Sequence, residues 1–129
     1  MAAFTLSNPD GVRRAAASYS LAAEVQAGAR RLVVSGQVGM SPDGTIPADP
    51  AAQIELAFEN LRLVLQAHGM DVANLMKTTV FLTDRSLLGP YREVRGRIMG
   101  DHAPASTLLF VAGLASPEFL GEIEAEAVA

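Results

Sequence analysis

The stretch from residue 120 to residue 128 carries three carboxylates at alternate positions. Glu122, Glu124 and Glu126 alternate there with apolar residues, which predicts a strand. Because successive side chains of a strand point to opposite faces, the three carboxylates share one face, about 7 Å apart. A carboxylate that faces a pocket can act as a general acid or base. The alternative is a charged edge strand that blocks aggregation, and the spacing alone favours this alternative.

A second polar group, Ser106 and Thr107, stands immediately before an apolar run. Pro104 fixes its own φ and lacks an N–H, which suits the entrance of a strand. The four apolar residues 108–111 follow without polar alternation, as is typical of a strand buried on both faces. We therefore expect a central strand. The two hydroxyls at its rim can hold a ligand, or they can simply satisfy backbone groups nearby.

The histidines and the arginine cluster have simpler explanations. His68 lies at the expected end of a helix and His102 in a loop, so no catalytic histidine pair is expected. Arg92, Arg95 and Arg97 lie off the apolar stripe of a second expected helix. That position favours a solvated face.

Two helices are predicted to support these residues. Asp49 as the N-cap and Pro50 at the first helical position begin a helix over residues 50–68. Apolar residues recur there at helical spacing, and Gly69 fits the C-terminal cap. The second helix covers residues 86–99.

The remaining elements are strands. Besides the two strands above, β-rich patterns cover residues 4–6, 18–25, 31–38 and 74–83. Strands 18–25 and 31–38 are expected to pair antiparallel through a hairpin turn. Gly36, inside the latter strand, indicates a bulge or the close approach of another group.

From residue 18 onwards the element order is β-β-α-β-α-β-β. It predicts an α+β fold in which a mixed sheet carries both helices on one face. The other face keeps apolar side chains, and no third helix is available to cover them. Self-association is therefore expected, with a pocket between subunits.

The length, composition and net charge of the chain limit the classes of function that it can have. The chain has 129 residues, which suggests a single domain over residues 1–129. Its mean hydropathy is +0.24, which also favours an oligomer interface. It has no cysteine, so we expect a cytoplasmic protein without disulfides or thiolate chemistry. A net charge of −4 argues against nucleic-acid binding, and no leader or membrane span is expected.

Taken together, the segments resemble the Rid family (YjgF/YER057c/UK114), whose founding members are reactive-intermediate enamine/imine deaminases. The resemblance covers about residues 17–128. It rests on the order and spacing of several short segments, namely Tyr19-Ser20, residues 34–38, 53–61 and 77–84, Pro104-Ala105 and residues 122–125. It implies a chorismate-mutase-like fold and a homotrimer around a central barrel, with a small metabolite bound in clefts between subunits.

The resemblance also implies a reaction without metal or organic cofactor. Water adds to the imine carbon of a 2-imino acid, and ammonia leaves to give a 2-oxo acid. Tyr19 and Glu122 match the family's tyrosine and the glutamate that helps to place the water. Ser35 and Gly36 match a Ser-Gly pair that completes the cleft.

One wall of that cleft departs from the family pattern. Ser106 stands where an arginine holds the substrate carboxylate, and a neutral hydroxyl cannot replace a planar cation. Leu108 replaces a cysteine, and Arg92 replaces a helix asparagine. We therefore expect weak or no activity on 2-aminoacrylate. Arg92 is one candidate for the missing cation; Arg13 and Arg14 have less support.

The sequence thus favours a divergent Rid-type hydrolase that acts on an imine, an enamine or a related small metabolite. Its expected catalytic residues are Tyr19 and Glu122, and its expected substrate-binding residues are Ser35, Gly36, Arg92, Ser106, Thr107 and Leu108. The alternative is a non-catalytic, metabolite-binding trimer or a partner of a metabolic enzyme. Ribonuclease activity is disfavoured by the acidic balance.

Overall fold

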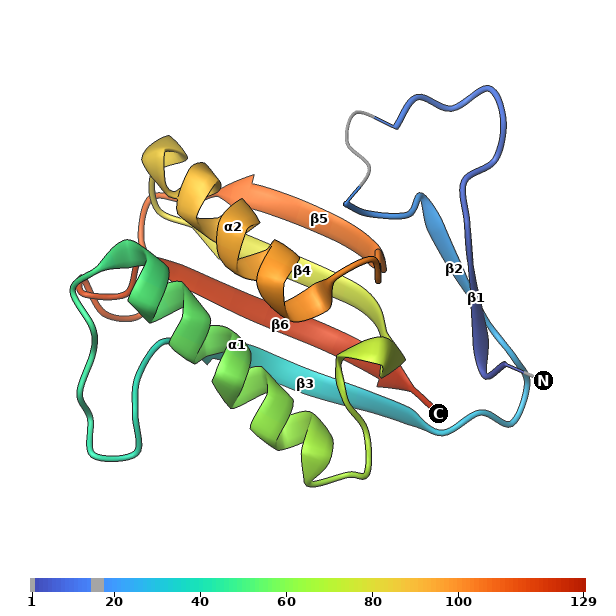
Figure 1. The fold of residues 1–129 in the computed structure, drawn as a ribbon, viewed down its shortest axis with the longest axis horizontal. Coiled ribbons are helices and arrows are strands. Elements are labelled where there is room, and N and C mark those ends of the chain that lie inside the picture. The colour runs from blue at the N-terminus through green and yellow to red at the C-terminus, as the bar shows by residue number, and fades with distance from the viewer. Residues whose placement is uncertain (1, 15–17) are drawn as a thin grey trace.

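The computed structural model describes residues 2–14 and 18–129. Within them the chain forms a two-stranded sheet, a four-stranded sheet and two α-helices (Figure 1). In chain order the elements are β1 (Phe4–Ser7), β2 (Ala22–Val25), β3 (Arg31–Val38), α1 (Pro50–Gln66), β4 (Leu75–Leu82), α2 (Leu88–Met99), β5 (Ala105–Phe110) and β6 (Gly121–Val128). From β2 onwards this is the predicted order.

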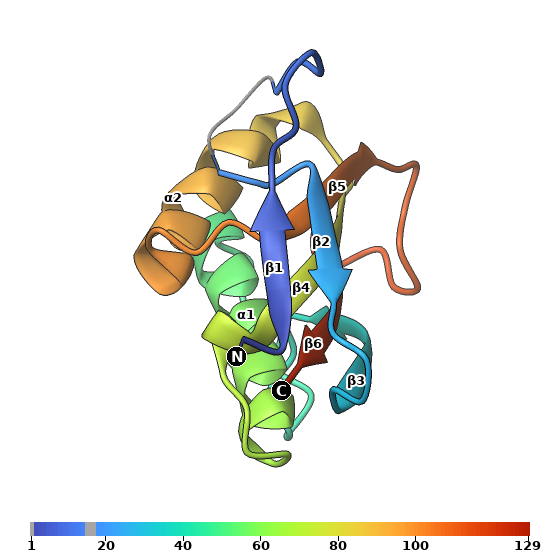
Figure 2. The same cartoon turned by 90° about the vertical axis from the view of Figure 1, so that its right-hand side faces the viewer.

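Both helices cover the same face of the four-stranded sheet, so the predicted α+β architecture is confirmed (Figures 1 and 2). Helix α1 lies over β3 and β6, and α2 lies over β4 and β5 (Figure 1). The core between the layers is apolar; its largest fully buried side chains include Phe58, Leu61, Leu65, Leu82 and Val94. No helix in the described ranges is long and apolar enough to cross a membrane.

The order of strands in the main sheet is β3-β6-β4-β5. Strand β6 is antiparallel to both of its neighbours, and β4 runs parallel to β5. The interpretation of residues 120–128 as an edge strand is therefore wrong, because β6 is paired on both sides.

The expectation that residues 104–111 form a central strand is also wrong. Leu108 packs against the core, whereas Leu109 is 46% exposed on the opposite face, so the apolar run is buried on one side only.

The first strands pair differently from the prediction. The short strand expected near residues 4–6 exists as β1, but it is the partner of β2, with Phe4 opposite Val25. Strand β3 is joined instead to β6, and the backbones of Arg30 and Ala129 extend this pairing with two hydrogen bonds of 2.8 and 2.9 Å. The expected hairpin between residues 18–25 and 31–38 is therefore wrong. The β1–β2 ribbon stands at the end of the main sheet, as Figure 2 shows.

Local signals placed the helices well. The Asp49 carboxylate accepts a hydrogen bond of 2.9 Å from the Ala52 N–H, and α1 begins at Pro50 as predicted. A short 3-10 turn over Arg85–Leu87 precedes α2, which then ends at Met99.

A buried glutamine of α1 ties the loops to the core. The Gln53 side chain is 1% exposed; its Nε2 donates to the carbonyls of Pro47 and Glu118, each at 3.0 Å. Its Oε1 accepts from the Leu120 N–H at 2.7 Å. Gly39, just after β3, packs so tightly here that a Cβ would stand 2.8 Å from the Gln53 carbonyl carbon and closer still to its oxygen.

We expect Gly39→Ala to destabilise the protein by about 1–3 kcal/mol, because a backbone oxygen cannot move aside without shifting α1. The measurement is the free energy of unfolding in urea. Gly113→Ala is the control, since a Cβ there meets nothing within 4 Å. Equal unfolding free energies for the two variants would contradict the close packing.

Candidate functional site

A cavity of about 400 Å³ opens between α2 and β5. Its wall is formed by the segment before β2, by α2 and by β5; the lining residues are Ser18, Tyr19, Leu88, Tyr91, Arg92, Arg95, Ser106, Thr107 and Leu108. Five of the eight predicted site residues therefore meet in one place. They come from three segments that lie far apart in the sequence.

The other three predicted residues lie elsewhere in the chain. Strand β4 stands between β5 and β6, so Glu122 is separated from the cavity by a strand. Glu122 also faces away from the helices, because its neighbour Ile123 is buried in the core. Ser35 and Gly36 lie in β3 near Glu122 and do not line the cavity. A single chain does not bring the two groups together.

The Ser-Gly pair makes room for the glutamate. The pairing of β3 with β6 shifts register between Val34 and Gln37, so Ser35 and Gly36 lie in a bulge. A Cβ at Gly36 would stand 2.7 Å from the carboxyl carbon of Glu122. The prediction of a bulge or close approach at Gly36 is confirmed in both respects, and the absent side chain lets the carboxylate lie across β3.

The two hydroxyls of β5 point to opposite faces of the sheet. On the helix side, the Thr78 hydroxyl donates to Ser106 Oγ at 2.9 Å. On the other side, Lys77 Nζ donates to Thr107 Oγ1 at 2.7 Å, although Thr107 also borders the cavity. Of the pair, Ser106 is the hydroxyl on the same face as α2.

The α2 wall of the cavity contains a buried phenol and a buried cation. Tyr91 and Arg95 are 6% and 7% exposed. Burial raises the pKa of the Tyr91 phenol, and the charge and hydrogen bond of Arg95 oppose that rise. Arg95 also donates from Nη2 to the His102 carbonyl at 3.1 Å.

The expectation of a solvated face therefore holds for Arg92 and Arg97, which are exposed, and is wrong for Arg95. One signal could have identified it: Arg95 follows Tyr91 by four residues and Val94 by one, at the border of the apolar stripe.

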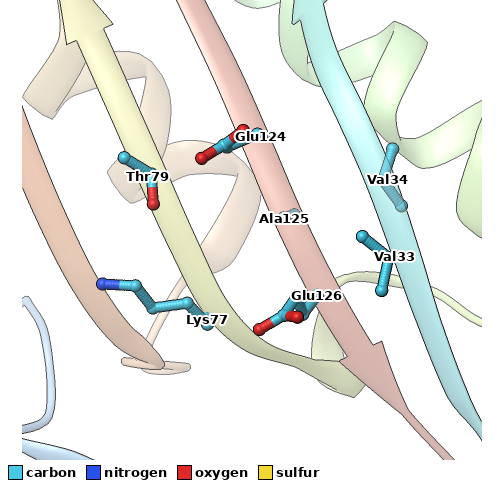
Figure 3. A pocket seen from close by; sticks show the side chains of 7 residues that line it. All are labelled: Val33, Val34, Lys77, Thr79, Glu124, Ala125 and Glu126. Carbon is cyan, nitrogen blue, oxygen red and sulfur yellow. The ribbon is translucent and has the colours of Figure 1, made fainter.

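The opposite face of the sheet holds a smaller cavity of about 280 Å³ (Figure 3). Its lining residues are Val33, Val34, Lys77, Thr79, Glu124, Ala125 and Glu126. Figure 3 shows the Lys77 amine turned away from Glu126. Glu126 instead forms an ion pair with Arg31 at the start of β3.

Both histidines have structural partners. His68 Nδ1 lies 2.9 Å from the Val64 carbonyl, and His102 Nε2 lies 2.7 Å from the Leu75 carbonyl. Across residues 2–14 and 18–129, no three His, Asp or Glu side chains lie close enough together to hold a metal ion.

Comparisons with known proteins agree with this fold. The model of the family described as Endoribonuclease L-PSP matches residues 11–129. A 2-iminobutanoate/2-iminopropanoate deaminase of Rattus norvegicus is 37% identical over 101 residues, which cover 77% of this chain and 73% of the relative. Protein DfrA of Myxococcus xanthus is 35% identical over 107 residues, 81% of each chain.

Among solved structures, YyfB of Yersinia pestis, described as a member of the conserved Rid protein family, superposes with a TM-score of 0.87. It is 26% identical, and the match covers 99% of this chain and 100% of that one. The superposed structure has the same class of fold, in which two helices cover one face of a mixed sheet, and the sequence matches agree with it. The chain belongs to the Rid (YjgF/YER057c/UK114) family.

The buried phenol leads to a prediction about pH. The pKa of the Tyr91 phenol is raised in the folded state. The contribution of this phenol to stability is therefore complete below the pKa of a tyrosine in the unfolded chain, which is about 10. That contribution is lost as the pH rises through the folded-state pKa. We expect unfolding free energies measured between pH 9 and 11 to fall more steeply for the natural chain than for Tyr91→Phe. Parallel profiles would contradict the raised pKa.

Proposed function

We propose that this chain is a divergent Rid-type hydrolase that acts, without a cofactor, on an imine, an enamine or a related small metabolite. The observation that carries the proposal is the cavity between α2 and β5, in which Tyr19, Arg92, Ser106 and Leu108 meet. The deaminase name of the Rattus norvegicus relative supports the reaction class.

In the proposed reaction, water adds to the imine carbon and the C–N bond then breaks. The water's two protons pass to nitrogen, so that an imine and water give a carbonyl compound and ammonia. Glu122 accepts a proton from the attacking water and returns it to the leaving nitrogen. Tyr19 orients the imine by a hydrogen bond, and the bulge at Ser35 and Gly36 leaves room for the Glu122 carboxylate.

The proposal requires a second subunit. Within one chain, Glu122 and the cavity stand on opposite faces of the sheet, with β4 between them. The face that carries Glu122 also exposes apolar side chains, including Val33 at 67%. We infer a homotrimer in which Glu122 of each subunit approaches the cavity of its neighbour, so that a small metabolite binds between subunits.

Mixing two inactive variants tests this arrangement. We expect Tyr19→Phe and Glu122→Gln to be inactive alone, because each removes one half of every cleft. Random mixed trimers of the two should recover about a quarter of the natural activity, since that fraction of clefts holds both natural side chains. Ammonia release is the readout, with light scattering to establish a mass of three 13.5 kDa chains. Full activity of either variant, or no recovery on mixing, would contradict the shared cleft.

Ser106 sets the expected substrate preference. A hydrogen bond to a charged group contributes about 1.5–3 kcal/mol, against about 0.5–1.5 for a neutral pair. We expect the natural chain to be weak or inactive on 2-aminoacrylate, and Ser106→Arg to raise that rate about tenfold or more. The assay couples an enzyme that generates 2-imino acids to ammonia detection, with Ser106→Ala as the control. Fast turnover by the natural chain would contradict the assigned role of position 106.

A second candidate is a non-catalytic, metabolite-binding trimer or a partner of a metabolic enzyme. It is favoured by the Ser106 hydroxyl, which already accepts a hydrogen bond from Thr78 and carries no charge. Binding of small metabolites without ammonia release from any imine would support it. We propose no nucleic-acid partner, because the chain is acidic and its His68 and His102 rings contact backbone carbonyls.

A further inference from the structure

Two arginines of α2 line more than one cavity. Arg92 and Arg95 border the cavity beside β5 and also a neighbouring one of about 400 Å³. The second cavity is completed by Ser18, Gly96, Gly100, Asp101 and Ala103. The residues common to both cavities are therefore two arginines and Ser18.

Neither arginine has a carboxylate partner. The four ion pairs found in the described ranges use Arg31, Arg62 and Arg97, and none uses Arg92 or Arg95. The residues outside those ranges are Met1 and three alanines, which have no carboxylate side chains. Arg95 is 7% exposed, so it is a buried cation, and its hydrogen-bond partners are the His102 carbonyl and the Tyr91 phenol. A buried charge without a counter-charge is costly unless a bound anion neutralises it.

The net charge of the side chains around these two cavities is positive. Asp101 borders the second cavity but is exposed and forms no ion pair with either arginine. Arg14 lies next to a residue that lines the first cavity, because its Nη1 donates to the Tyr19 carbonyl at 3.3 Å. Three guanidinium groups thus stand near the cavity wall against one carboxylate.

We propose that Arg92 and Arg95 bind the carboxylate of a small-molecule ligand in the cavity between α2 and β5. A guanidinium group offers paired N–H donors that match the two oxygens of a carboxylate. The anionic end of the ligand then lies on the helix wall, across the cavity from Ser106. The assignment of this ligand as a substrate rests on the proposed function; the anion site itself rests on the unneutralised charges of this chain.

The direct test is calorimetric titration with 2-oxobutanoate, the hydrolysis product of 2-iminobutanoate, and with its uncharged methyl ester. We expect the natural chain to bind the acid and to bind the ester at least tenfold more weakly. Arg92→Gln should weaken binding of the acid roughly 10- to 100-fold. Equal binding of acid and ester, or no binding of the acid, would overturn the proposal.

A matched control comes from the same helix. Arg97→Gln removes the same charge from α2, but Arg97 is exposed and pairs with Glu55 at 3.1 Å, so binding should be unchanged. Because Arg95 is buried, Arg95→Lys is preferred to a neutral variant; it keeps the charge but loses the paired donors. Its thermal unfolding is measured first, and for the folded variant we expect weaker binding of the acid. If Arg92→Gln and Arg95→Lys both bind like Arg97→Gln, the site is wrong.

Ammonia release, measured in the same variants, separates this inference from the proposed function. If the acid binds in an arginine-dependent way but no ammonia is released, the result would support the anion site and contradict the proposed hydrolase function. Ammonia release from imino acids that is unchanged in Arg92→Gln and Arg95→Lys would support the hydrolase and overturn the anion site.

Discussion

The hydrophobic core of this protein lies on only one side of its main sheet. Both helices lie on one face of the four-stranded sheet, so every strand has a buried face and an uncovered face (Figure 2). On β6, Ile123 packs into the core while Glu122 points the other way. This constraint divides the polar chemistry of the chain, because a cavity beside α2 and a carboxylate on the open face cannot serve the same ligand within one chain. In the homotrimer that we propose, a second copy brings the two faces together.

Signals that act over a few residues predicted most of the fold. Asp49 and Pro50 fixed the start of α1, because capping depends only on the adjacent backbone. The position of β5 could not be predicted in this way. Its apolar run predicts burial on both faces, yet Leu109 is 46% exposed in the single chain. Which strand lies at an edge depends on pairing between distant segments, and β2 likewise paired with β1 rather than with its neighbour β3.

The site shows the same limit. The resemblance to the family selected Tyr19, Arg92 and Ser106, and the fold brings these residues to one cavity. It did not select Arg95, since the hydrophobic pattern assigned that residue to the solvated side. A long side chain at the border of an apolar stripe can extend inwards, and only the packing of α2 against the loop that contains His102 decides its direction.

The position of β6 has a consequence for the order in which the chain can fold during synthesis. Its two neighbours, β3 and β4, leave the ribosome first, and β6 follows β4 by a few seconds at roughly 5–20 residues per second. During that interval the nascent chain holds two strands whose facing edges lack their common partner. Such edges can pair with other chains. Chaperone capture would therefore be most useful to this protein in the interval before Gly121–Val128 is made.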